Sequence, residues 1–257
     1  MRRSLVMLLS IVILTMPMVT LFASECGDVN NDASLNIFDI THLISYLYRD
    51  GSEPECGLAG TVTDIDGNHY LTLKIGDQWW MMENLEVTHY RNGDPIPNVT
   101  NAGEWAGLST GAYCNYDNDT SNVPVYGRLY NWYAVVDSRN IAPEGWHVPS
   151  DAEWQTLVDY LGGETVAGGK MKEVGTVLWV PPNTGATNES FFGGIPGGFC
   201  SYLGMFSGIG YQADFWSCTE GDPDLFGWYR ELFYYYSEVL RSITNKESGL
   251  SIRCVKD

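Results

Sequence analysis

The stretch YGRLYNWYAVVDSRNIAPEGWHVPSDAEWQTLVDYL, residues 126–161, decides the predicted fold. Each of its two halves carries apolar residues at helical spacing. These residues are Leu129, Trp132, Tyr133 and Val136 in the first half and Trp154, Leu157, Val158 and Leu161 in the second. Ser150 and Glu153 form a capping box before the second run, and Gly162-Gly163 ends it. We therefore expect two amphipathic helices, joined by a corner rich in proline, glycine and tryptophan.

The corner contains His147, the one histidine that could belong to a site. No plausible nucleophile or metal partner accompanies it in the sequence. A single histidine without such a partner does not make a catalytic constellation. We therefore expect His147 to be structural and to fill a polar niche beside Trp146 and Trp154.

Short strands are expected on both sides of these helices, because runs of β-branched and aromatic residues alternate with Gly, Asn and Asp turns. The predicted strands are 62–65, 70–75, 78–85, 176–180, 191–196, 211–216, 228–236 and 250–255, with a hairpin turn at Asp66-Gly67 and a loop over 91–111. Acid-rich turns at 64–66 and 112–119 could bind an ion, but such side chains more often bond to their own backbone. Two helices among many short strands make the predicted class α+β.

The last third of the chain is rich in aromatic residues and glycine. Aromatic side chains on the surface of a sheet could stack on sugar rings. The same side chains could instead form the core of a loop-rich fold that has few aliphatic residues. Both alternatives stay open at this point, and we favour the core.

The first 23 residues have the layout of a secretory signal. Arg2 and Arg3 precede a run without charged residues, 5–22, and Ala23 is followed by Ser24-Glu25. The run is also long enough to span a membrane, but the small residue at its end and the acidic sequence beyond it favour cleavage after Ala23. We therefore expect a secreted protein, extracellular or at the cell surface, that has no membrane attachment after cleavage.

The chain is strongly acidic, with a formal net charge of −18 at pH 7. Removal of the signal takes away two arginines and no acid, which brings the net charge to about −20. Such a surface repels nucleic acid and anionic membranes, and we expect neither as a partner. All six cysteines lie beyond the signal. An even number in an oxidising compartment predicts up to three disulfides.

Residues 26–56 carry a calcium-loop pattern. Side chains with oxygen atoms occupy positions 1, 3, 5, 7, 9 and 12 of a twelve-residue loop, namely Asp28, Asn30, Asp32, Ser34, Asn36 and Asp39. A hard cation takes six or more oxygen ligands, so this spacing predicts a Ca²⁺ site. Ala33 stands where such loops usually have glycine, which predicts weak binding. The alternative is an Asx-rich turn that caps the following helix without a metal.

This loop and its helix resemble one type I dockerin repeat. Dockerins that bind cohesins normally pair two repeats, so the resemblance does not extend to cohesin binding. Cys26 and Cys56 bracket the module. We expect a bridge between them, which would stabilise the module by about 3–4 kcal/mol in the chain-entropy model.

Motifs along the remainder of the chain carry a second resemblance. They are Asp66-Gly67, Trp79-Trp80-Met81, Glu83-Asn84-Leu85, Tyr126-Gly127-Arg128-Leu129-Tyr130, and the runs 145–154, 216–220 and 251–257. In this order they are similar to the Fibrobacter succinogenes major paralogous domain, whose members are exported bacterial proteins. The resemblance implies a C-type lectin-like or sulfatase-modifying-factor-like fold, with two helices packed on irregular antiparallel sheets. It implies no established activity.

The predicted domains are a signal peptide at 1–23, a dockerin-like calcium module at 24–57 and the Fibrobacter-type domain at 58–257. The family more often has residues other than cysteine at the positions of Cys200 and Cys218. The resemblance therefore implies an added Cys200–Cys218 bridge, which leaves Cys114 to pair with Cys254.

We expect a non-catalytic binding or adhesion protein that recognises glycans or takes part in polysaccharide degradation. One alternative is a structural protein of the cell surface or of an assembly, docked to a cell-surface protein through the dockerin-like module. Another is an oxidoreductase like the formylglycine-generating relatives of the fold. Those need closely spaced reactive cysteines, whereas Cys200 and Cys218 are far apart in the sequence. A shared fold does not by itself fix a function.

Overall fold

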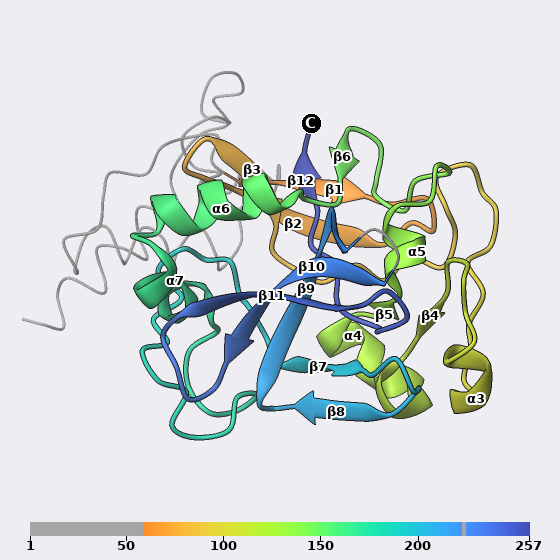
Figure 1. Ribbon diagram of the computed structural model, residues 1–257. Coiled ribbons are helices and arrows are strands. Elements are labelled where there is room, and N and C mark those ends of the chain that lie inside the picture. Colours follow the sequence, from red (N-terminus) through yellow and green to blue (C-terminus); the bar gives the residue numbers. More distant parts are fainter. Residues whose placement is uncertain (1–58, 223–224) are drawn as a thin grey trace, which may run out of the picture. The chain divides into compact units, whose positions relative to one another are not determined.

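A computed structural model describes residues 59–222 and 225–257 (Figure 1). The predicted signal peptide, the calcium ligands from Asp28 to Asp39 and the Cys26–Cys56 bridge lie outside these residues and stay predictions. The described elements are mostly strands, with a few short helices, which confirms the α+β class. Within the described residues, no helix has the length and apolar character needed to cross a bilayer.

The strands are short except for those of one long meander. In chain order they are β1 (Ala59–Thr63), β2 (His69–Ile75), β3 (Gln78–Met81), β4 (Tyr113–Cys114), β5 (Leu129–Tyr130), β6 (Trp146–His147), β7 (Gly197–Cys200), β8 (Phe206–Ile209), β9 (Gln212–Asp222), β10 (Phe226–Phe233), β11 (Val239–Asn245) and β12 (Val255–Lys256).

Two five-stranded sheets and one two-stranded sheet organise the described residues. The first sheet has the order β1-β2-β3-β12-β6, the second has the order β11-β10-β9-β7-β8, and β4 pairs with β5. The meander β9–β10–β11 is antiparallel throughout, and its register places Glu231 opposite Asp214. β7 runs parallel to β9 and antiparallel to β8.

The described helices are α3 (Ala102–Trp105), α4 (Val123–Tyr126), α5 (Trp132–Val135), α6 (Asp151–Tyr160) and α7 (Glu164–Met171), with 3₁₀ turns η1 (Tyr116–Asn118) and η2 (Thr120–Asn122). The second predicted helix is confirmed as α6. Its capping box is complete, because the Ser150 hydroxyl accepts from the Glu153 backbone N–H at 3.2 Å and the Glu153 carboxylate accepts from the Ser150 N–H at 2.8 Å.

The first predicted helix is wrong. Leu129 and Tyr130 form β5, and Tyr130 also bridges Leu250, so the backbone bonds to neighbouring strands instead of to its own next turn. Asn131 then caps the single turn α5, accepting from the Ala134 N–H at 3.1 Å. Val136, expected in the buried stripe, is 42% exposed. Strand pairing from distant segments outweighs the helical periodicity here.

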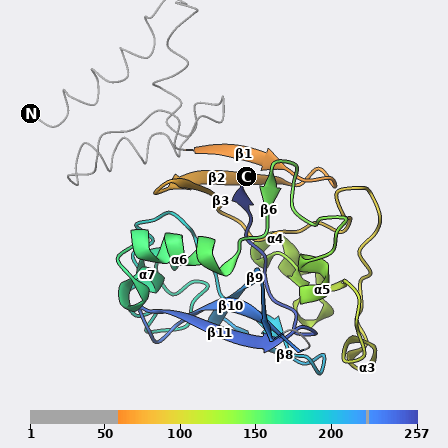
Figure 2. The same cartoon turned by 45° about the horizontal axis from the view of Figure 1, so that its top comes forward.

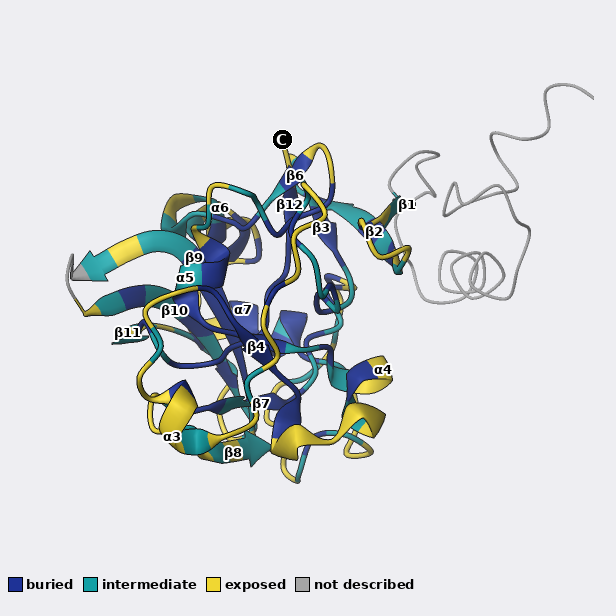
Figure 3. Cartoon of the chain, turned by 90° about the vertical axis from the view of Figure 1, so that its right-hand side faces the viewer, coloured by how far each residue is buried: buried dark blue, intermediate teal, exposed yellow. Residues whose placement is uncertain are grey.

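α6 lies between the two five-stranded sheets (Figure 2). Its Trp154 is fully buried, with ring centroids 4.7 Å from Trp80 of β3 and 5.7 Å from Phe215 of β9. The Trp154 indole N–H donates to the Trp216 carbonyl at 3.2 Å. One side chain thus joins both sheets. Buried residues concentrate on the interior strands, whereas much of α3 is exposed (Figure 3).

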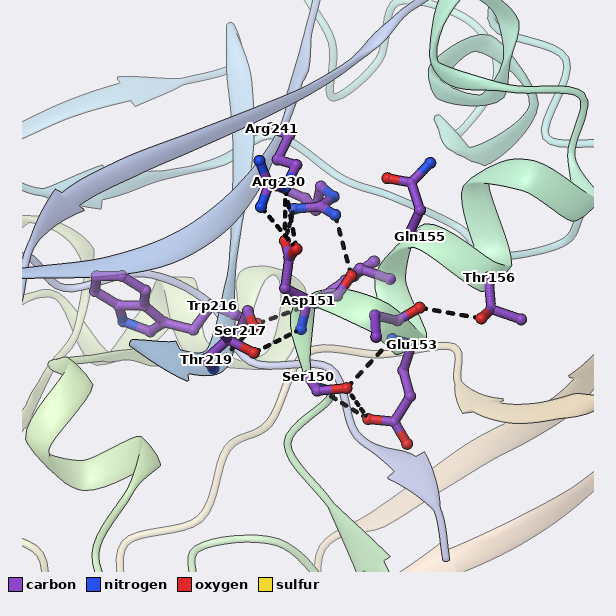
Figure 4. Close-up of polar contacts among 12 residues, drawn as sticks. Ser150, Asp151, Glu153, Gln155, Thr156, Trp216, Ser217, Thr219, Arg230 and Arg241 are labelled. Carbon is purple, nitrogen blue, oxygen red and sulfur yellow. Dashed lines mark hydrogen bonds and ion pairs between the residues drawn. The ribbon is translucent and has the colours of Figure 1, made fainter. Parts of the chain in front are cut away.

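Charged side chains tie the first turn of α6 to the second sheet (Figure 4). Asp151 accepts from Arg230 at 2.6 Å and from Arg241 at 2.9 Å. Burial alone would raise the pKa of Asp151, but the hydrogen bonds from Arg241 and Arg230 outweigh burial and lower that pKa. An acid at this position also complements the positive end of the helix.

The remaining strand predictions are partly right. Strands lie over most of 62–63, 70–75, 78–81, 212–216 and 228–233, as expected. The expected strands at 176–180 and 191–196 are wrong, because these segments are irregular loops. Trp179 and Phe192 of these loops are nevertheless buried, and the Trp179 indole N–H donates to the Gly194 carbonyl at 3.0 Å. The apolar residues of these two segments therefore pack in the core without forming regular strands.

Candidate functional site

The aromatic residues of the last third range from fully buried to half-exposed. Phe215 and Trp216 are fully buried. Four tyrosines keep between 45% and 56% of their surface exposed, namely Tyr202, Tyr211, Tyr235 and Tyr236. The two alternatives drawn from the sequence therefore apply to different residues, and the exposed tyrosines are accessible to a ligand.

Five aromatic residues form one continuous cluster at the turn between β10 and β11, which we call the aromatic cluster. They are Tyr211, Phe233, Tyr234, Tyr235 and Tyr236. Ring centroids of Tyr211 and Tyr234 lie 5.3 Å apart, those of Phe233 and Tyr234 4.8 Å, and those of Tyr235 and Tyr236 5.7 Å. These separations are typical of favourable aromatic pairs. The exposed tyrosines of the aromatic cluster therefore share one packed patch.

Backbone hydrogen bonds from several segments hold this turn in place. The Tyr234 N–H donates to the Tyr211 carbonyl at 2.8 Å, which fixes the start of β9 against the end of β10. The Thr184 N–H donates to the Tyr234 carbonyl at 2.8 Å, and the Gly169 N–H donates to the Ser237 carbonyl at 2.8 Å. The turn is thus fastened to the loop after α7 and to α7 itself.

Lys172, directly after α7, supports the aromatic cluster from inside. Its side chain is fully buried, and its ammonium donates to the carbonyls of Thr184, Phe233 and Tyr236 at 2.9, 3.1 and 2.7 Å. Burial lowers the pKa of Lys172 to about 8. Two of the three carbonyls belong to the aromatic cluster, so the lysine fixes the turn that presents the tyrosines. Our sequence prediction did not include Lys172.

A depression elsewhere on the surface is too small for a sugar-sized ligand. It is a shallow hollow between α3 and β7–β8 without enclosed space for even a water molecule, and its lining includes Trp105, Cys200 and Phe206. Ligand pockets for small molecules typically hold about 300–1,000 Å³. The aromatic cluster, by contrast, is an exposed patch that needs no cavity, and we treat it as the candidate site.

His147 has the structural role expected of it. Its ring bonds to Asp257 at 2.6 Å and to Glu153, the capping-box acid of α6, at 2.8 Å. Burial alone would lower the pKa of His147, but the hydrogen bonds to Asp257 and Glu153 outweigh burial and raise it. The ring joins β6 to the start of α6.

The two acid-rich turns use their side chains within the fold. Asp64 accepts from the backbone N–H groups of Asp66 and Asn68, both at 2.9 Å, and from the Tyr70 hydroxyl at 2.6 Å. Asp119 accepts from the Ser121 N–H at 2.8 Å. In residues 59–222 and 225–257, no group of three or more His, Cys, Asp or Glu side chains is placed to hold a metal.

The cysteines are placed differently from the pairing that the family resemblance implies. The four described cysteines, Cys114, Cys200, Cys218 and Cys254, are free thiols in the structure. Cys114 and Cys200 share one core cluster, whereas Cys254 belongs to another, against which Cys218 packs.

The fold and the aromatic cluster define an α+β domain that carries an exposed aromatic patch. The chain belongs to the Fibrobacter succinogenes major domain family, whose model matches residues 73–256. Comparison with curated proteins gave no match, and comparison with solved structures gave none.

Proposed function

We propose that this protein is a secreted, non-catalytic binding module that recognises glycans through the aromatic cluster. The observation that carries the proposal is the packed patch of half-exposed tyrosines at the β10–β11 turn. Tyrosine combines an apolar ring face with a hydroxyl that stays in water, which suits the apolar faces and hydroxyl groups of a sugar ring. Contiguous exposed apolar surface commonly marks an interaction site.

The rigidity of the turn supports this proposal. Backbone bonds and the buried ammonium of Lys172 fix the turn before a ligand arrives. A preorganised surface loses less conformational entropy on binding than a mobile loop. The acidic net charge favours neutral glycans over anionic ones.

The proposal includes the wider architecture expected from the sequence. We propose a C-type lectin-like arrangement for the described domain, a signal peptide at 1–23, and weak calcium binding by the dockerin-like loop from Asp28 to Asp39. In this arrangement the N-terminal module serves attachment, and the aromatic cluster serves recognition.

A glycan array probed with the full chain, with and without calcium, tests the function. We expect binding to neutral polysaccharides that is lost in a Tyr235→Ala/Tyr236→Ala variant. Each ring should contribute roughly 1 kcal/mol, so the dissociation constant should rise by at least about tenfold. Tyr202→Ala is the matched control, because Tyr202 is 46% exposed, like Tyr236 at 45%, and lies outside the aromatic cluster. An array without any bound glycan in both conditions would contradict the proposal.

A further inference from the structure

Cys114 and Cys200 meet inside a small core cluster. Both side chains are 1% exposed, and the cluster is completed by Trp105, Ala112, Tyr116 and Leu129. Cys114 comes from β4 and Cys200 from the end of β7, two strands that belong to different sheets. The two side chains therefore lie in one buried cluster, although 86 positions separate them in the sequence.

Gly249 makes room for this approach. Cys200 and Gly249 exchange two backbone hydrogen bonds, at 2.9 and 2.7 Å. A side chain at Gly249 would place its Cβ 3.1 Å from the Cβ of Cys200 and 2.9 Å from the Trp105 ring. Since glycine leaves this space free, the Cys200 side chain and the Trp105 ring can both pack there, in the cluster that also contains Cys114.

The buried environment also affects the reactivity of the Cys114 and Cys200 thiols. Burial and the neighbouring thiol of Cys200 raise the pKa of Cys114 well above its usual range. Buried thiols of this kind react slowly with reagents in solution. Oxidation must therefore occur before the cluster closes around the two sulfur atoms.

We propose that Cys114 and Cys200 form a disulfide when the chain folds in an oxidising compartment. The oxidant is a disulfide, from a dithiol oxidoreductase or from oxidised glutathione. One protein thiolate attacks it and releases one thiol, and the second protein thiolate then displaces the other. Two protein thiols and one oxidant disulfide thus become one protein disulfide and two released thiols. This inference is independent of glycan binding.

Peptide mapping of the unreduced full chain tests the pairing. The reduced chain is refolded with oxidised and reduced glutathione, denatured, alkylated and digested. Trypsin leaves Cys200 and Cys218 on one peptide, because no Lys or Arg lies between Lys172 and Arg230. A second digestion before Asp214 separates them. Among the four cysteines that the structure describes, we expect Cys114 to be linked to Cys200.

Two cysteine variants distinguish the alternative disulfide pairings. Cys218→Ser should leave the Cys114–Cys200 link intact, whereas the Cys200–Cys218 pairing implied by the family would leave Cys200 alkylated. Cys114→Ser should leave the Cys200 thiol fully alkylated after denaturation. Alkylation of both Cys114 and Cys200 in the unmodified chain, or linkage of either one to a different cysteine, would overturn the proposal. The mapping needs only the unmodified chain, so a variant that fails to fold does not weaken it.

Discussion

Asp214 is an acid near the start of β9 that is only 2% exposed. Its Oδ2 accepts from the Gln212 side chain at 2.8 Å, while its Oδ1 has no hydrogen-bond partner within the part of the chain that the structure describes. Burial and the negative charge of Glu231 raise the pKa of Asp214 well above its usual range. Ionisation of this carboxyl group is therefore unfavourable in the folded state.

Asp214→Asn should stabilise the protein, and more so at high pH. A raised folded pKa means that stability is fully present below the unfolded pKa, about 3.9, and is lost as the pH rises through the folded pKa. The amide cannot ionise, and its oxygen can still accept from Gln212. We expect a gain of at least about 1 kcal/mol at pH 8, or roughly 2–4 °C in Tm, and little gain at pH 4.

Thermal unfolding of both proteins between pH 4 and pH 9 measures this effect. Asp159→Asn is the control, because Asp159 lies on the exposed face of α6. A lower Tm for Asp214→Asn than for the unmodified protein at pH 8 would show that the ionised carboxylate is stabilising.

The burial of single residues such as Asp214 and Lys172 could not be predicted from the sequence. Asp214 lies between Ala213 and Phe215, and Lys172 follows Met171, so both look like ordinary polar positions beside buried ones. Their burial results from strands and loops far away in the chain, which no local pattern encodes. His147 could be interpreted correctly because its partner Glu153 belongs to the adjacent capping box.

At the scale of elements, locally encoded features were predicted and the others were not. α6 carries its own cap, acidic first turn and Gly-Gly stop, and it forms where expected. α5 shortens to one turn because β4 and Leu250 compete for the same backbone groups. α7 was missed, since its N-cap is Gly163 without a side-chain cap and glycines fill its centre. The sequence showed that this region is rich in aromatic residues, but not that five of them gather at one turn.

The turn between β10 and β11 depends on Lys172. Lys172→Met keeps the apolar stem but removes the ammonium, so the carbonyls of Thr184 and Tyr236 lose their partner. The Phe233 carbonyl keeps the Tyr236 N–H at 3.3 Å. Such a loss costs about 1–3 kcal/mol for each buried group left unpaired. We expect destabilisation of about 2–4 kcal/mol, together with weakened glycan binding because the turn loses its fixed shape.

Urea unfolding and amide exchange at 233–238 measure the two parts of this prediction. Lys170→Met is the control, because Lys170 pairs with Glu189 and its side chain is 34% exposed. Equal effects of the two substitutions on exchange at the turn would contradict a specific role for Lys172.

At the scale of the whole molecule, the predicted class was right and the arrangement of its layers was not predicted. The apolar stripe of α6 identified which face is buried, but not that two separate sheets cover it. That arrangement arises because β12 (Val255–Lys256) joins β3 and β6, which completes the first sheet from opposite ends of the domain. Trp154 then has to fill the space between the layers.

Trp154→Ala tests whether this one ring couples the two sheets. It removes contacts to Trp80 and Phe215 and the hydrogen bond to the Trp216 carbonyl. Loss of a fully buried tryptophan costs about 3–5 kcal/mol. Because the ring touches both sheets, we expect one cooperative unfolding transition at a lower urea concentration. The dependence of the free energy of unfolding on urea concentration should stay unchanged, and far-UV circular dichroism measures both quantities. Tyr160→Ala, on the same helix and 64% exposed, should shift the midpoint little. Two separate transitions in the Trp154→Ala protein would mean instead that the sheets unfold independently once the ring is gone.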